Sequence, residues 1–135
     1  MVKKSNSKVI GEKTEGQILA RLLQLEKTVL IPFGDNQRYD LVIDDNGKFL
    51  RIQCKTGRFK NGAIIFDTCS SYCHRGGKKV SYINQIEYFA VYCPDNHQCY
   101  MISIDEVANT KCTLRIDQPK NNNSKNIRMA SDYIL

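Results

Sequence analysis

The sequence has no long hydrophobic run. No stretch approaches the ~20 consecutive apolar residues that a membrane-spanning helix requires. The basic residues at positions 1–8 are not followed by an apolar segment, so we do not expect them to form a secretory signal. Proline and glycine are also scarce, at 3 and 8 of 135 residues, while hydrophobic residues make up 41% of the chain. This composition excludes a collagen-like, disordered or low-complexity chain, and we expect a soluble intracellular protein.

The length predicts a single folded domain. A chain of 135 residues falls within the usual size of one domain. A chain of this size buries roughly two thirds of its unfolded surface, so an ordinary hydrophobic core is sufficient to hold it together. We expect residues 1–10 to form a flexible basic N-terminus and residues 11–135 to form one domain with a basic C-terminal tail.

The six cysteines occur in a sequence without a secretory signal, so we expect reduced thiols. Two groups of cysteine and histidine, at 69–74 and at 93–99, offer a zinc site as an alternative. Their spacings are not those of a standard zinc ribbon or finger. We therefore interpret the cysteines as structural.

Acidic residues are outnumbered by basic ones, 14 against 20, and the charge is unevenly placed. Residues 46–80 carry eight basic side chains and one acidic side chain, and residues 111–130 carry five and one. Residues 81–110 carry four acids and no Lys or Arg. Such basic segments favour a polyanionic partner such as DNA or RNA. A solvated basic face without a partner is the alternative.

Hydrophobic periodicity predicts an α/β or α+β sheet with a helix on its face. Residues 11–27 read as a helix, because apolar residues between Ile18 and Leu25 recur at helical spacing. An Asn-Gly pair at 61–62 marks a turn before one of the strands. We expect strands at 28–31, 39–44, 49–56, 63–66, 86–93, 98–104 and 112–116, with a polar loop at 69–80.

The Asn46-Gly47 pair predicts a two-residue hairpin and thereby a register. Residues whose numbers sum to 93 then face each other across the hairpin. One face pairs Tyr39 with Cys54, Leu41 with Ile52 and Ile43 with Leu50. These residues are apolar or nearly so, as a buried face requires. The other face pairs Asp40 with Gln53, and Lys55 follows two residues later on that face. Asp40, Gln53 and Lys55 are therefore expected to converge.

Glu15 lies at the centre of the apolar stripe of the expected helix. A buried carboxylate must meet a cation, a metal or hydrogen-bond donors, because an unpaired one is costly. The alternative is a frayed first turn, where acids also suit the helix dipole. Because Asp40, Gln53 and Lys55 already suggest a site, we expect Glu15 to join it.

Two carboxylates, a carboxamide and a lysine suit a hard cation, Mg²⁺ or Mn²⁺, better than zinc. Such a metal can orient and deprotonate water beside a phosphodiester. The ammonium group of Lys55 would stabilise the charge that develops on the reacting groups. Together with the basic segment that follows, these residues predict metal-dependent phosphodiester hydrolysis.

Glu15, Asp40 and the run Gln53-Cys54-Lys55 resemble the motif of the PD-(D/E)XK nucleases, a family that includes many restriction enzymes and Holliday-junction resolvases. Tyr39 replaces the proline of that motif, and Gln53 replaces its second acid. A glutamine there is similar to the PD-(D/E)XK homing endonucleases encoded in bacterial group I introns. Three further segments resemble that branch: 11–16 (GEKTEG), 89–92 (FAVY) and 127–130 (IRMA).

The resemblance implies a fold, an activity and roles for individual residues. The fold is α/β, a restriction-endonuclease-like core with a mixed central sheet and a flanking N-terminal helix. The activity is sequence-specific cleavage of double-stranded DNA in the bacterial cytoplasm by a homo-oligomer, a dimer or tetramer. Asp40 and Glu15 would bind Mg²⁺ or Mn²⁺ together with the Cys54 backbone carbonyl, Gln53 would orient water or metal, and Lys55 would stabilise charge.

The basic segments supply the candidate DNA contacts. Arg58 and Lys60 flank a hairpin tip, and a two-stranded ribbon fits the major groove. The glycines at 76–77 would let a loop approach phosphates. The complete set of candidates is Arg58, Lys60, His74, Arg75, Lys78, Lys79, Lys120, Lys125 and Arg128.

Two other functions fit the same residues. One is a structure-selective nuclease, similar to a Holliday-junction resolvase, that recognises branched DNA. The other is a DNA-binding protein without catalysis, in which Gln53 marks a lost active site.

Overall fold

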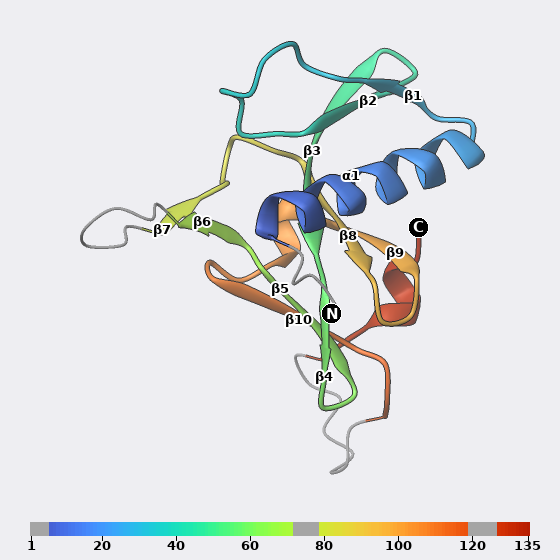
Figure 1. The fold of residues 1–135 in the computed structure, drawn as a ribbon, viewed down its shortest axis with the longest axis vertical. Helices are drawn as coiled ribbons and strands as arrows, with labels where there is room; N and C mark the ends of the chain where they lie inside the picture. Colours follow the sequence, from blue (N-terminus) through green and yellow to red (C-terminus); the bar gives the residue numbers. More distant parts are fainter. Residues whose placement is uncertain (1–5, 72–78, 119–126) are drawn as a thin grey trace.

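The computed structural model describes residues 6–71, 79–118 and 127–135. One helix and a set of β-strands make up this part of the chain (Figure 1). Helix α1 spans Ser7–Gln24, and short 3₁₀ turns occur at Ile104–Glu106 and Ala130–Tyr133. No helix of the described residues is long and apolar enough to cross a membrane.

Helix α1 begins four residues earlier than the periodicity predicts. Asn6 caps it, because its side-chain Oδ1 accepts a hydrogen bond of 2.9 Å from the Val9 amide. Residues 7–10, which the sequence assigned to a flexible N-terminus, are therefore helical. The other end of the helix is also earlier, at Gln24, and Glu26 follows with a φ of 60°.

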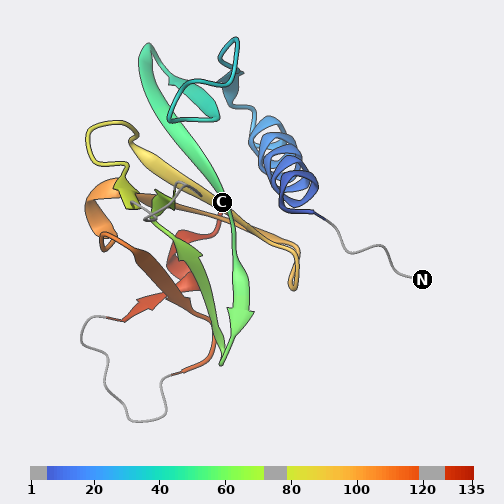
Figure 2. The same ribbon diagram turned by 60° about the vertical axis from the view of Figure 1, so that its left-hand side comes forward.

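The central sheet has five strands in the order β1-β2-β3-β8-β9. Strands β3 and β8 run parallel and the other neighbours are antiparallel, so the sheet is mixed, as expected. Helix α1 lies against one face of this sheet (Figure 2). The five strands are β1 (Thr28–Leu30), β2 (Leu41–Asp45), β3 (Lys48–Thr56), β8 (Tyr88–Cys93) and β9 (Gln98–Ser103).

The predicted hairpin register is confirmed over five residue pairs, from Asp45↔Lys48 to Leu41↔Ile52. Asn46 and Gly47 both adopt a positive φ, of 54° and 91°, as a two-residue turn of this hand requires. The apolar face of the hairpin packs against Ile18 and Leu22 of α1 in one of two hydrophobic cores.

A second sheet of four strands has the order β11-β10-β5-β4. Its buried side chains, among them Phe66 and Leu114, form the other core with Phe89 and Val91 of the central sheet. Two further strands, β6 and β7, pair within the segment 69–80 that the sequence predicted as a loop. The bounds are β4 (Arg58–Lys60), β5 (Ala63–Asp67), β6 (Cys69–Ser71), β7 (Lys79–Ser81), β10 (Lys111–Arg115) and β11 (Arg128–Met129).

A single residue, Gly57, joins the two larger sheets, because β3 ends at Thr56 and β4 begins at Arg58. The Gly57 amide donates to the Tyr92 carbonyl at 2.8 Å. A Cβ atom at this position would lie 2.6 Å from Ile64 Cγ2, so only glycine fits here. The end of β3 is thus fixed against the core immediately after Lys55 and Thr56.

Candidate active site

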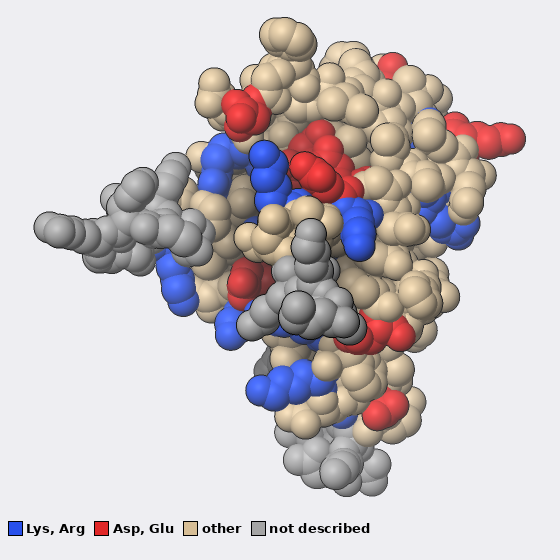
Figure 3. Space-filling model, in the orientation of Figure 1, with Lys and Arg blue, Asp and Glu red and all other residues tan. Residues whose placement is uncertain are grey.

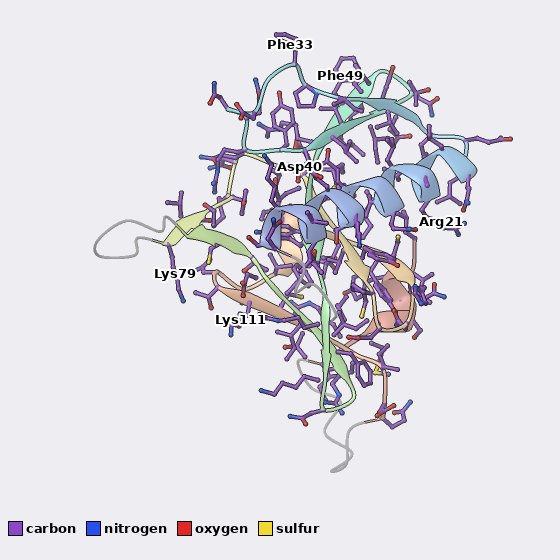
Figure 4. The ribbon with its side chains drawn as sticks, viewed as in Figure 1. Arg21, Phe33, Asp40, Phe49, Lys79 and Lys111 are labelled. Atoms are coloured by element: carbon purple, nitrogen blue, oxygen red, sulfur yellow. The ribbon has the colours of Figure 1, made fainter. Side chains whose placement is uncertain are left out.

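Asp40 lies where β2 and β3 separate. The ladder ends at Leu41↔Ile52, so the expected pairs Tyr39–Cys54 and Asp40–Gln53 are wrong. The Asp40 amide instead donates to the Ile52 carbonyl at 2.8 Å, and its Oδ2 accepts from the Cys54 amide at 2.9 Å. The carboxylate thereby replaces a strand partner for Cys54 of β3; Figure 4 labels Asp40 just above α1 in that view.

The Cys54 carbonyl lies on the same edge of β3 as the Cys54 amide, since the two groups of one strand residue point to the same side. This edge faces Asp40, because the Cys54 amide donates to the Asp40 carboxylate. The thiol of Cys54 packs into the core between the sheet and α1, and burial raises its pKa. The main chain of Cys54, and not its sulfur, therefore faces the site.

Lys55 extends its ammonium group toward β6 and the residue that follows β7, Tyr82. Its Nζ lies 3.4 Å from the Cys69 carbonyl and 3.5 Å from the Tyr82 hydroxyl. The same Nζ lies 5.0 Å from the centroid of the Tyr82 ring. Two oxygen acceptors and an aromatic face thus hold the cation in one place.

Glu15 is half-buried on α1, and it flanks the buried stripe instead of centring it. Thr14, Ile18 and Leu22 form that stripe at i, i+4 and i+8. Partial burial raises the pKa of Glu15, and the nearby charge of Asp40 raises it further. The two carboxylates are therefore near enough to influence each other, and Glu15 lies beside the stripe; a shared site stays a prediction.

The pKa of the Asp40 carboxyl group is affected by burial, by a hydrogen bond and by a nearby charge, in opposite directions. Burial raises the pKa of its carboxyl group, while the hydrogen bond from the Cys54 amide and the charge of Lys55 lower it. The raising effect of burial is the largest, so the pKa of Asp40 lies above its ordinary value. An additional cation beside this carboxylate would favour the ionised form.

Gln53 occupies the position between the apolar Ile52 and Cys54 on β3 and is half-buried. Alternation along the strand puts it on the same face as Lys55. In the parallel ladder it stands opposite Phe89 of β8. The carboxamide is therefore close to the lysine along the strand, and the expected cross-strand contact with Asp40 is absent from the ladder.

Two residues support the site in a role that the sequence did not predict, Arg38 and Tyr82. The Arg38 guanidinium carbon lies 3.9 Å from the centroid of the Tyr82 ring, whose other contacts include Lys55. Arg38 Nη1 also donates to Ser70 Oγ at 2.6 Å and its Nη2 donates to the Ser81 carbonyl at 3.1 Å. The segment that carries Asp40 is thereby tied to β6 and β7. The sequence signal for this pair is weak: an arginine two residues before Asp40 and a tyrosine shortly after the basic segment.

A hydrogen bond between α1 and β3 also supports the site, and the sequence did not predict it. Thr14 of α1, which is 3% exposed, lies 2.6 Å from Thr56 of β3 through their hydroxyl oxygens. This hydrogen bond joins the residue before Glu15 to the residue after Lys55. It fixes the helix against the strand at the level of the site.

The DNA-contact candidates divide into described and undescribed residues. Arg58 and Lys60 are exposed on β4, next to the Asn61-Gly62 turn, and Lys79 is exposed on β7. Arg128 is half-buried on β11. The remaining candidates lie outside the described residues: His74, Arg75, Lys78, Lys120 and Lys125.

The cysteines that are described are free, and four of them are buried: Cys69, Cys93, Cys99 and Cys112. Within the described residues no group of three or more His, Cys, Asp or Glu side chains is placed to hold a metal ion. The interpretation of these cysteines as structural agrees with their burial. Cys73 and His74 of the alternative zinc site lie outside the described residues.

The amino-acid sequence matches a known protein family. A family model described as PD-(D/E)XK endonuclease matches residues 5–135. The chain belongs to the PD-(D/E)XK endonuclease family. Its family resemblance and its fold class are thus confirmed, and the family makes it a nuclease with nucleic acid as its substrate.

One solved structure supports the fold assignment of this PD-(D/E)XK protein. The bacterial homing endonuclease I-Ssp6803I superposes with a TM-score of 0.77, and the match covers 96% of this chain and 89% of that one. The identity between the two is 22%, so the likeness concerns the fold. No curated protein matches the sequence.

The donors of the site fit a hard divalent cation. Glu15 and Asp40 supply carboxylate oxygens and Cys54 supplies a main-chain oxygen on the same edge. Two carboxylates are fewer than an all-protein cage requires, but Mg²⁺ commonly uses one or two carboxylates with substrate phosphates and water. Burial contributes most to the raised pKa of Glu15, and the charge of Asp40 adds to it; a cation at the site would offset that repulsion.

Proposed function

We propose that this chain is a divalent-metal-dependent endonuclease of the homing type, which cuts both strands of duplex DNA at a defined sequence. The observation that supports it best is the hydrogen bond between the Asp40 carboxylate and the Cys54 amide, directly before Lys55. It holds a half-buried carboxylate beside β3 just beyond the end of its pairing with β2, and the side chain of the next residue, Lys55, is a cation held by its neighbours. Glu15 approaches the same point from α1.

Asp40, Glu15 and the Cys54 carbonyl would hold the metal, Mg²⁺ or Mn²⁺. When bound, the metal supplies a water of lowered pKa and charge to offset that of the phosphate. The hydrogen bond from the Cys54 amide keeps one Asp40 oxygen in place, and the other oxygen would serve as the metal ligand. The half-buried position of Asp40 limits competing water around the carboxylate.

Lys55 would stabilise negative charge on the phosphodiester as it is attacked. Its partners, the Cys69 carbonyl and the Tyr82 hydroxyl, are neutral acceptors. They orient the ammonium group and leave its charge intact, whereas a carboxylate partner would neutralise it. Gln53, on the same strand face, would orient the attacking water through its carboxamide.

The homing type is supported by the fold of I-Ssp6803I, which is described as a bacterial homing endonuclease. Gln53 at the position of the second acid of the motif agrees with that branch. By the same analogy we infer the bacterial cytoplasm as the compartment, where buried thiols such as Cys93 and Cys112 stay reduced.

We also infer that two or more copies act together. Each chain provides one Asp40–Lys55 site, whereas the two strands of a duplex run in opposite directions. A two-fold assembly presents one site to each strand. Light scattering of the purified protein, alone and with DNA, measures the number of copies.

The decisive experiment is cleavage of DNA by the purified chain with Mg²⁺ and with EDTA. Randomised linear duplexes and a four-way junction are offered as substrates, and the ends of the products are sequenced. Metal-dependent cutting of linear duplex at one recurring sequence is the expected result. Cutting of the junction alone would favour the resolvase-like function, and binding without cutting under all conditions would favour the non-catalytic one.

A further inference from the structure

The outer face of the four-stranded sheet is rich in cations. Side chains alternate along its strands, so that Ile64, Phe66 and Leu114 face the core while the positions between them face outward. The pairing of β4 with β5 and of β5 with β10 then brings outward positions of three strands side by side. The charged residues at these positions are Arg58, Lys60, Asp67, Lys111 and Arg115.

A hollow of about 230 Å³ lies at one end of this face. Figure 4 shows two of its residues, Lys79 and Lys111, on the same side of the molecule, and Figure 3 shows Lys and Arg side chains gathered over that region. The hollow is lined by Arg58, Asp67, Cys69, Lys79, Thr110 and Lys111. Three cations thus surround a space that contains one carboxylate.

The carboxylate of Asp67 does not neutralise these cations. Arg58 Nη2 lies 3.8 Å from Asp67 Oδ1, and the two side chains are 62% and 51% exposed. An exposed pair at this distance is weak, so the guanidinium keeps donors available for another anion. Lys111 stands directly opposite Asp67 in the ladder and offsets its charge further.

The wall of the hollow is held rigidly from behind. Thr68, which is 2% exposed, donates through its hydroxyl to the Ala108 carbonyl at 2.5 Å and through its amide to the Thr110 carbonyl at 2.9 Å. These bonds fix Cys69 and Thr110, the polar floor between the cations. The main chain behind the hollow is therefore held in place, while the exposed cationic side chains in front of it can adjust to a compact anion.

The hollow adjoins the candidate active site. Cys69, one of its lining residues, accepts from Lys55 Nζ through its carbonyl at 3.4 Å. Arg58 follows Lys55 by only three residues, across the fixed Gly57. An anion in the hollow would therefore be close to the phosphate that Lys55 faces.

We propose that this hollow, the phosphate pocket formed by Arg58, Lys79 and Lys111, binds a backbone phosphate of the DNA close to the phosphate that is cut. The proposal rests on the proposed function, because DNA must already lie at Lys55. Lys111 distinguishes this proposal from the sequence-based predictions, since neither the family motif nor the expected DNA contacts include it.

The test measures the affinity of a short fluorescent duplex in EDTA over about 50–200 mM salt. Each lost phosphate contact lowers the slope of log K against log salt by about 0.9. We expect that decrease for Lys111→Ala and for Lys79→Ala, and about twice that decrease for the double variant. Lys111→Arg should keep the slope of the parent, because it keeps the charge.

The matched control is Lys27→Ala, which removes an exposed lysine next to β1. Its slope should equal that of the parent. If Lys111→Ala and Lys79→Ala also keep the parent slope while the parent cuts duplex DNA, the phosphate pocket is wrong and the nuclease function stands. If the parent neither binds nor cuts duplex DNA, the proposed function fails and the pocket with it. An unchanged thermal midpoint in each variant excludes a folding defect as the cause.

Discussion

The five-stranded sheet and the four-stranded sheet present different charges to the solvent. At the edge of the central sheet, Asp40 and the nearby Glu15 of α1 place two carboxylates at one point. On the outer face of the other sheet, Asp67 is the only acid on the four strands, among several cations. Lys55 and Arg58 stand on either side of the junction between the sheets. We infer that one sheet carries out the reaction and the other holds the substrate, so variants should separate cleavage from affinity.

Asp40→Ala should have the largest effect and fall on cleavage alone. Loss of the oriented carboxylate removes metal-derived stabilisation of several kcal/mol, which corresponds to about 10³-fold in rate or more. DNA affinity should persist, because phosphate contacts supply most of it. Single-turnover cleavage and binding in EDTA measure the two quantities, and retained turnover would contradict the assignment of the site.

Substitution of Gln53 should have the next largest effect and should also fall on cleavage. Gln53→Ala should lower the cleavage rate by about 10²-fold, because an oriented polar group is lost. Gln53→Glu should keep measurable cleavage, since it restores an acid of nearly the same size at the motif position. A Mg²⁺ titration of single-turnover rates compares them. Parental rates in Gln53→Ala would place Gln53 outside the site.

Gly57→Ala should weaken both sheets together, because the added Cβ meets Ile64 at 2.6 Å and Val91 at 3.0 Å. Both neighbours are fully buried, so overpacking should lower the free energy of unfolding by about 1–3 kcal/mol. Gly11→Ala is the control, because nothing lies within 4 Å of its added Cβ and alanine favours the helix by up to about 1 kcal/mol. Denaturant unfolding checks both. Equal stability of the two variants would show that the junction tolerates a side chain.

Arg58→Ala should have the smallest effect and fall on binding. Its loss should lower the salt slope of DNA binding by about 0.9, with the cleavage rate at saturating DNA little changed. A change in preferred sequence would instead place Arg58 at a base edge, where a good contact contributes about 1–3 kcal/mol of discrimination. Selection of cleaved sequences by parent and variant distinguishes the two. An unaltered slope with an unaltered preference would mean that Arg58 does not face DNA.

The sequence predicted the hairpin of β2 and β3 because a two-residue Asn-Gly turn determines its register locally. Its assignment of Glu15, Asp40 and Lys55 to one site stays a prediction, although the charge of Asp40 acts on Glu15 and that of Lys55 acts on Asp40. The predicted register failed at the first residue beyond the regular ladder, where Asp40 has no strand partner and instead accepts a hydrogen bond from the Cys54 amide with its side chain. Local pairing rules cannot anticipate such a divergence of strands.

The supports of the site were not predictable for a related reason. Tyr82 lies 27 residues from Lys55 along the chain and reaches it only because β6 and β7 pair. Arg38 contacts Ser70 across 32 residues. The strands β6 and β7 have three residues each, and their segment is polar, so hydrophobic alternation gives no signal for them.

The parallel pairing of β3 with β8 has a consequence for the order of folding. Asp40 and Cys54 are 14 residues apart and belong to one hairpin, which can form early from local contacts. Tyr82, by contrast, comes to Lys55 from a connection that must be closed before β8 can align with β3, and closing it costs chain entropy. We therefore expect the carboxylate half of the site to be assembled before the lysine is held in position. During refolding, nuclease activity would then return only with the last structural step and would report complete folding more strictly than helix content does.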